Sequence, residues 1–218
     1  MFRLALLIAL VNLSNFWVYW IFESNFLLGL LLLTESLGLY LINLQSADKK
    51  VIILTSAILI ILTCYLLLNH FDKNIFSTSI TDTIQKEERH NYYAQEMGRV
   101  YKNRVGIFYF NSIEPILNKI GGKFFLYLDF SYYFAPREFA SLEKYFPPLA
   151  ILFVFGLFNI LKAGNKMLIV YLTIVLIVTS LTKLDNKLGP ILLFPFINLC
   201  LTVGLSKIPI LNRHLKSK

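Results

Sequence analysis

The feature that most constrains the fold of this chain is a set of six apolar runs, three before and three after a polar middle segment. They are 16 to 19 residues long and extend over Leu4–Phe22, Phe26–Leu44, Val51–Leu68, Pro147–Ala163, Met167–Thr182 and Leu188–Ser206. A helix of that length measures roughly 24–28 Å, close to the hydrocarbon thickness of a bilayer. The sequence therefore predicts an all-α polytopic membrane protein with about six transmembrane helices. The two runs within residues 147–182 are short enough to form a re-entrant or interfacial hairpin instead.

The composition agrees with a membrane protein, because 56% hydrophobic residues, 16% charged residues and a mean hydropathy of +0.62 fall outside the soluble globular range. The net charge of +8 is unevenly placed. Residues 70–146 hold ten Lys/Arg and nine Asp/Glu, whereas the rest of the chain holds eleven and four. The positive excess thus flanks the apolar runs, which favours lipid headgroups over nucleic acid as the partner.

The runs divide the chain into four parts. Residues 1–69 form a three-span half, 70–146 a cap, 147–206 a second three-span half and 207–218 a basic tail. Nine basic residues in short flanks are predicted on the cytoplasmic side: Arg3, Lys49, Lys50, Lys162, Lys166, Lys207, Arg213, Lys216 and Lys218. We therefore expect a cell-membrane protein with both termini in the cytoplasm and the 70–146 cap on the outer face.

The cap carries its own helical signals. Asp82 to Gln85 resembles a capping box, and apolar residues at helical spacing predict an amphipathic helix from about residue 83 to 104. Glu114-Pro115 predicts the start of a second helix that ends at Gly121-Gly122. The aromatic stretch from 124 to 134, broken by Asp129, is expected in the membrane interface.

Glu35 is the sharpest candidate for chemistry, because it lies at the midpoint of the second apolar run. An acid at that depth should be protonated or partnered. Asn12, Ser14 and Asn198 lie near the middle of other runs and are plausible hydrogen-bond partners. Two interpretations remain open: a polar clamp between packed helices, or a carboxyl coupled to proton or substrate movement.

The outer segment offers scattered ionisable groups and no diagnostic set. Asp72, His90, Asp129, Arg137 and Glu138 are its notable members. The three histidines lack metal-ligand spacing and no nucleotide-binding motif occurs, so neither a metal nor a cofactor is expected. Arg137 could hold an anionic headgroup or phosphate, or could pair with Glu138 or Asp129.

A resemblance covers residues 124–206. Tyr133 to Glu138, the Tyr145-Phe146-Pro147-Pro148 opening of a span, Gly156-Leu157, Pro190, Pro195-Phe196 and Gly204-Leu205 occur in an order that resembles the later spans of GT-C-type membrane glycosyltransferases. The resemblance implies a polyprenyl-phosphate sugar as donor and acidic residues in the first outer loop, where this chain has Glu23. A reduced or partial relative would fit the smaller number of spans.

Three functions are consistent with these patterns. The first is a non-enzymatic scaffold or accessory protein with a membrane-protein partner or a second copy of itself. In the second, lipid-linked sugar transfer, Glu23 or Asp129 would be the acid or base and Arg137 would hold the phosphate. The third is a small transporter or channel component that uses Glu35.

Overall fold

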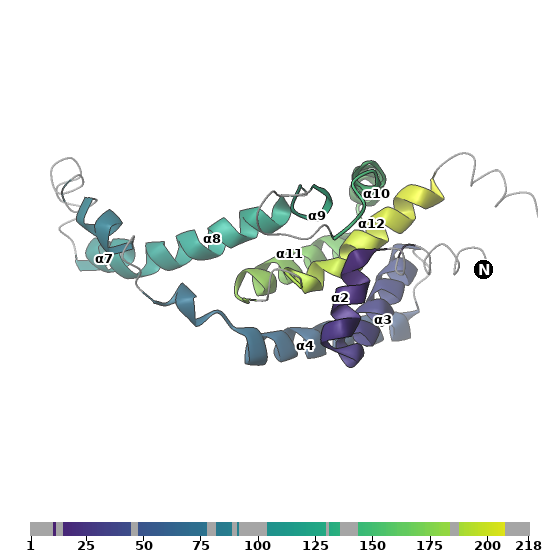
Figure 1. The fold of residues 1–218 in the computed structure, drawn as a ribbon, viewed down its shortest axis with the longest axis horizontal. Helices are drawn as coiled ribbons and strands as arrows, with labels where there is room; N and C mark the ends of the chain where they lie inside the picture. The colour runs from purple at the N-terminus through teal and green to yellow at the C-terminus, as the bar shows by residue number, and fades with distance from the viewer. Residues whose placement is uncertain are drawn as a thin grey trace, which may run out of the picture.

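The described part of the chain is helical (Figure 1). The structure is a computed structural model that describes residues 11, 15–44, 48–77, 82–88, 91, 104–129, 131–135, 144–183 and 188–207. Within those residues, extended backbone pairs at one place, the isolated bridge between Phe71 and Thr182. The predicted all-α class is confirmed.

The first two helices, α2 (Phe16–Ser24) and α3 (Phe26–Asn43), each begin at an asparagine. The Asn15 side chain accepts a hydrogen bond from the Val18 amide at 2.8 Å, and Asn25 accepts one from the Leu28 amide at 3.1 Å. Side-chain oxygens at this position satisfy amides that a helix start leaves unpaired. Asn25 therefore ends α2 and begins α3, so the turn between them is very tight.

Two helices are long and apolar enough to cross a membrane, judged by length and composition: α3, with 18 residues, and α4 (Lys49–His70), with 22. They correspond to the second and third predicted runs. The two helices approach closely where Gly38 faces Thr55, since a Cβ on Gly38 would overlap the Thr55 hydroxyl. Of the first predicted run, Leu4–Phe22, most residues lie outside the described part of the chain.

The last three predicted runs form shorter helices. They are α10 (Leu149–Ala163), α11 (Lys166–Ser180) and α12 (Phe194–Ser206), the last preceded by a 3-10 turn over Ile191–Leu193. Gly164 ends α10 in the left-handed conformation, with φ of 65°, and the Asn165 side chain caps α11. At 13 to 15 residues these helices measure roughly 20–22 Å, less than a full hydrocarbon core.

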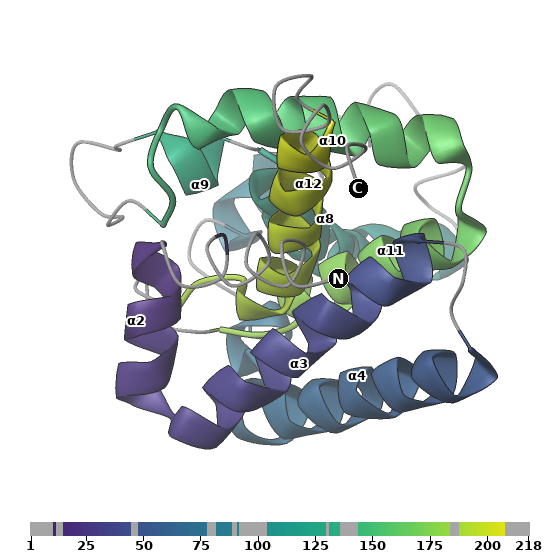
Figure 2. The ribbon, with the colours of Figure 1, turned by 90° about the vertical axis from the view of Figure 1, so that its right-hand side faces the viewer.

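Helix α12 occupies the centre of the molecule. Figure 2 shows α10 and α3 crossing it, and both helices contact it. Every residue from Phe194 to Gly204 is buried. The crossing with α10 depends on two glycines, because a Cβ on Gly156 would overlap the Cys200 carbonyl and one on Gly204 would overlap that of Leu152. Backbones can approach this closely only where no side chain intervenes.

The cap forms an arm that extends from the bundle (Figure 1). It contains a 3-10 turn (Lys73–Ile75), a helical stretch at 82–88, α7 (Arg104–Phe108), a π-helical segment (Tyr109–Ile113), α8 (Glu114–Leu128) and α9 (Ser131–Phe134). Helix α8 contacts α11, and the Lys123 ammonium pairs with the Asp72 carboxylate at 2.5 Å. Most of the helix predicted over residues 83–104 lies outside the described residues.

The predicted end of the second cap helix at Gly121-Gly122 is wrong. Helix α8 continues to Leu128, and neither glycine has a positive φ. Glycine within a helix costs only about 0.5–1 kcal/mol. The following turn offsets this cost, because Phe124, Tyr127 and Leu128 pack against the core.

Candidate functional site

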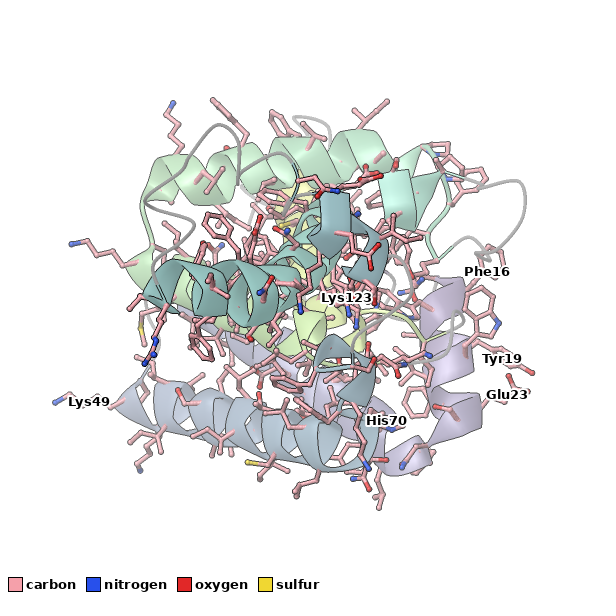
Figure 3. The ribbon with its side chains drawn as sticks, turned by 90° about the vertical axis from the view of Figure 1, so that its left-hand side faces the viewer. Phe16, Tyr19, Glu23, Lys49, His70 and Lys123 are labelled. Atoms are coloured by element: carbon pink, nitrogen blue, oxygen red, sulfur yellow. The ribbon has the colours of Figure 1, made fainter. Side chains whose placement is uncertain are left out.

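The two acids expected to serve sugar transfer are both exposed. Glu23 lies near the end of α2, on the outward face that also carries Phe16 and Tyr19 (Figure 3). Asp129 ends α8, and its side chain accepts a hydrogen bond from the Ser131 amide at 3.0 Å. Neither acid lines any of the cavities described below. Arg137 lies outside the described residues, as do Asn12 and Ser14.

Glu35 is fully buried on the packed face of α3. The buried residues Leu28, Leu32, Glu35, Leu39 and Ile42 alternate four and three apart, so the carboxyl occupies a core position in an otherwise apolar stripe. Among the described residues neither carboxyl oxygen has a hydrogen-bond partner.

Asn198, one of the three plausible partners of Glu35, has a different partner. Its side-chain oxygen accepts a hydrogen bond from the Tyr145 hydroxyl at 2.8 Å, so it fixes the segment before α10 to α12. The expected Glu35–Asn198 bond is not found in the described part of the chain.

Tyr171 of α11 is the polar group that interacts with Glu35. Its side chain is 6% exposed, and its hydroxyl is near enough to the Glu35 carboxyl for the two to interact electrostatically. Within the described residues, the Tyr171 hydroxyl and the neighbouring Ser36 hydroxyl also have no hydrogen-bond partner. A buried polar atom left unpaired costs about 1–3 kcal/mol, so a cluster of them is rare without a role.

Tyr171 also lines an apolar cavity between α3, α4 and α11. The cavity has a volume of about 330 Å³. Its lining residues come from all three helices: Leu39, Ile42, Thr55, Ser56, Leu59, Lys166, Met167, Leu168, Val170, Tyr171 and Ile174. Glu35 lies one turn before Leu39 on α3, outside the lining. The carboxyl is therefore enclosed by helix contacts, next to the cavity wall.

Lysines gather at one end of this cavity. The Asn165 side chain donates a hydrogen bond to the Ile42 carbonyl at 3.4 Å, so the turn between α10 and α11 lies beside the end of α3. Lys162 and Lys166 flank that turn, and Lys49 and Lys50 begin α4 after the α3–α4 turn. Among the described residues, Asp48 is the acid that adjoins these lysines in the chain. Figure 3 places Lys49 at the opposite edge of the molecule from Glu23.

A second buried polar cluster joins the cap to the bundle around Lys144, which is fully buried. The Lys144 ammonium lies 4.2 Å from the ring centre of Tyr132 and 5.4 Å from that of Trp17. Burial lowers the pKa of Lys144 to about 8. The Trp17 indole donates a hydrogen bond to the Leu188 carbonyl at 2.7 Å, and the Trp17 ring contacts Phe194. The cluster fixes α2 to the start of α12.

A polar cavity of about 230 Å³ lies on the arm, between the Ile75–Lys86 region and the start of α8. The π-helical segment contributes Asn111 and Ser112 to its lining. Lys119 closes one wall, since its ammonium contacts the Asp82 carboxylate at 2.6 Å and the Ser77 carbonyl at 2.6 Å. Lys119 and Asp82 thus hold the parts of the arm together at this cavity.

Sequence patterns missed Tyr171 and Lys144. Tyr171 lies in an apolar run, and no local sequence pattern distinguishes it from its neighbours. Its one sequence signal is that it follows Lys166 by five residues on the same helix. Lys144 precedes Tyr145 and Phe146 at the edge of a predicted span, where a lysine is ordinarily read as an exposed flank. Burial of both depends on contacts between segments far apart in the chain.

No family model, curated protein or solved structure matches this chain. What the protein does must therefore be inferred from its own residues.

Proposed function

We propose that this chain is a multi-pass integral membrane protein with an accessory, non-catalytic role. The observation that carries the proposal is the outer face of α4. Only Thr55, Ile58, Leu62 and Leu66 are buried in this 22-residue helix. Its exposed face includes the large apolar side chains Ile53, Leu54, Ile60, Ile61 and Leu68.

Exposed apolar side chains continue on neighbouring helices. On α10 they include Ile151, Val154, Phe155 and Phe158, and on α11 Ile169, Val170, Ile174 and Ile177. Soluble monomers rarely expose contiguous apolar patches larger than a few hundred Å². Lipid chains would cover these faces without the cost that water imposes. The short helices α10 and α11 would cross with flanking lysines that reach the headgroups.

The lysine positions support one orientation. The end of α3 lies beside the α10–α11 turn, and Lys49, Lys50, Lys162 and Lys166 occupy the helix ends next to these connections. We place this end on the cytoplasmic side, since basic residues in short loops favour that side. The α2–α3 turn at Asn25 lies at the other end of α3, so it and the cap belong to the outer face.

An accessory role is favoured over the two alternatives by the surroundings of the acids. A transporter carboxyl should line a polar pathway, whereas Glu35 is enclosed between packed helices. Sugar transfer needs an acid and a phosphate-binding group beside a substrate-sized groove. Glu23 is exposed, and Asp129 accepts the hydrogen bond from the Ser131 amide.

Cysteine accessibility tests the membrane placement. In a background with Cys64→Ser and Cys200→Ala, single cysteines replace the exposed residues Ser24, Ser77, Asp48 and Lys162. A membrane-impermeant thiol reagent added outside should label Ser24→Cys and Ser77→Cys but not the other two. Labelling of Ser77→Cys and Asp48→Cys from the same side would contradict the topology.

A transfer assay tests the non-catalytic role. The purified protein is incubated with a polyprenyl-phosphate sugar, and release or transfer of the sugar is measured. We expect no turnover above a protein-free blank. Turnover that is lost in both Glu23→Gln and Asp129→Asn would instead establish lipid-linked sugar transfer.

A further inference from the structure

The cavity between α3, α4 and α11 is a groove with an apolar floor and an open rim. Leu39, Ile42, Leu168 and Tyr171 are buried and form its floor. The exposed residues Lys166, Val170 and Ile174 follow one another four apart along α11, so they form one edge. From Lys166 to Ile174 the edge is about 12 Å long. This shape fits part of one extended hydrocarbon chain.

The two ends of the groove differ in charge. Lys166 stands at one end, and Lys162, Lys49 and Lys50 lie at the same end of the bundle with Asp48 as the described acid. Beyond Lys166, the described lining of the groove is uncharged. An occupant that complements this surface carries a negative group at one end and an alkyl chain at the other.

Tyr171 contributes its ring to the floor. It follows Lys166 by five residues, which places it about 7 Å further along the helix axis. The Tyr171 hydroxyl is enclosed on the side of Glu35, away from the opening of the groove. At this depth the groove therefore offers an aromatic surface that an acyl chain can cover.

We infer that this groove binds an anionic phospholipid of the surrounding bilayer. Lys166 contacts the phosphate, and one acyl chain lies over the Tyr171 ring between α4 and α11. The inference rests on the proposed membrane placement, because a bilayer supplies the ligand. The inference specifies the accessory role: the protein binds an anionic lipid at the end of the bundle that carries the lysines.

Electron paramagnetic resonance of spin-labelled lipids tests this site. The full-length protein is reconstituted in phosphatidylcholine vesicles with a trace of spin-labelled phosphatidylglycerol or phosphatidylcholine, and the motionally restricted fraction is measured. We expect restriction of phosphatidylglycerol in preference to phosphatidylcholine. Lys166→Gln should reduce that preference about fivefold, as expected for removal of one lysine near a lipid phosphate. Lys73→Gln, an exposed lysine at the other end of α4, is the matched control and should leave it unchanged.

Two tryptophan substitutions on α11 separate the groove from the surface charge. Val170→Trp fills the groove and should abolish the extra restricted phosphatidylglycerol. Ile169→Trp, at a neighbouring exposed position outside the lining, should not. Equal behaviour of these two variants, or of Lys166→Gln and Lys73→Gln, would overturn the inference. Circular dichroism confirms that each variant stays folded.

Tyr171→Phe tests the floor of the groove. It keeps the ring that lines the groove and removes only the enclosed hydroxyl, so the preference for phosphatidylglycerol should stay unchanged. A loss as large as that of Lys166→Gln would contradict an apolar floor. If cysteine mapping contradicts the membrane topology, the proposed function fails; if mapping succeeds and all lipid variants match their controls, only this inference fails.

Discussion

Helices α12 and α4 are both strongly apolar, yet their surroundings are opposite. In α12 every residue from Phe194 to Gly204 is buried, whereas α4 buries four of its 22 residues. The shorter helix is enclosed by the bundle, and the longer one exposes most of its surface. Helix α3 contacts both of them.

The difference shows that hydropathy does not by itself place a helix at the centre. Small residues do so here, because Gly156 and Gly204 let the backbones of α10 and α12 meet. Between helices that already lie in lipid, close packing and hydrogen bonds provide the driving force. Helix α4 has one such close approach, Gly38 against Thr55.

The largest expected effect comes from breaking the centre. Gly156→Ala should lower the free energy of unfolding by about 3 kcal/mol, because the new methyl group overlaps the Cys200 carbonyl and the backbones must separate. Thermal unfolding in detergent micelles measures the change. Gly121→Ala in α8 is the control, since its Cβ meets nothing within 4 Å, and it should stabilise by about 0.5–1 kcal/mol. A neutral Gly156→Ala would contradict the close crossing.

The two faces of α4 should respond differently to truncation. Leu62→Ala removes a side chain that is 1% exposed and should cost about 2 kcal/mol, near the low end for buried leucines. Ile61→Ala, on the face assigned to lipid, should change the free energy of unfolding by less than about 0.5 kcal/mol. Denaturation in mixed micelles compares them. Similar costs would show that both faces of α4 are packed.

Lys144, beside the start of α12, should make stability depend on pH. Burial lowers its pKa to about 8 in the folded protein, from its ordinary value of 10.5 in the unfolded chain. Between these values the unfolded state binds more protons, so stability rises with pH, by about 1 kcal/mol from pH 8 to 9. Melting temperatures across this range test it. In Lys144→Met the rise should vanish, and a wild-type protein that loses stability over the same range would disprove the assignment.

A substitution at Glu35 tests how α3 packs between α4 and α12. An acid enclosed at this depth should be neutral, so Glu35→Gln preserves its shape and should change the free energy of unfolding by less than about 0.5 kcal/mol. Reversible denaturation in micelles measures it. A larger loss, or a change in proton movement across proteoliposomes, would favour the coupled carboxyl over the packing clamp.

Local patterns predicted several elements well. Asn25 separates the first two apolar runs, and the second and third runs became α3 and α4 within a few residues. Asp129 ends α8 where the predicted break lies. Gly121 and Gly122 led to a wrong prediction of a helix end. A glycine ends a helix where its backbone is left-handed, as at Gly164.

The sequence by itself determined the apolar runs, the balanced polar middle and the basic turns, because length, hydropathy and charge are properties of neighbouring residues. Only the tertiary structure decided that α12 is central and α4 peripheral, that Asn198 pairs with Tyr145 and that Tyr171 meets Glu35. Those outcomes depend on which helix faces meet across large distances in the chain. Apolar segments of similar composition carry no local mark of their partners.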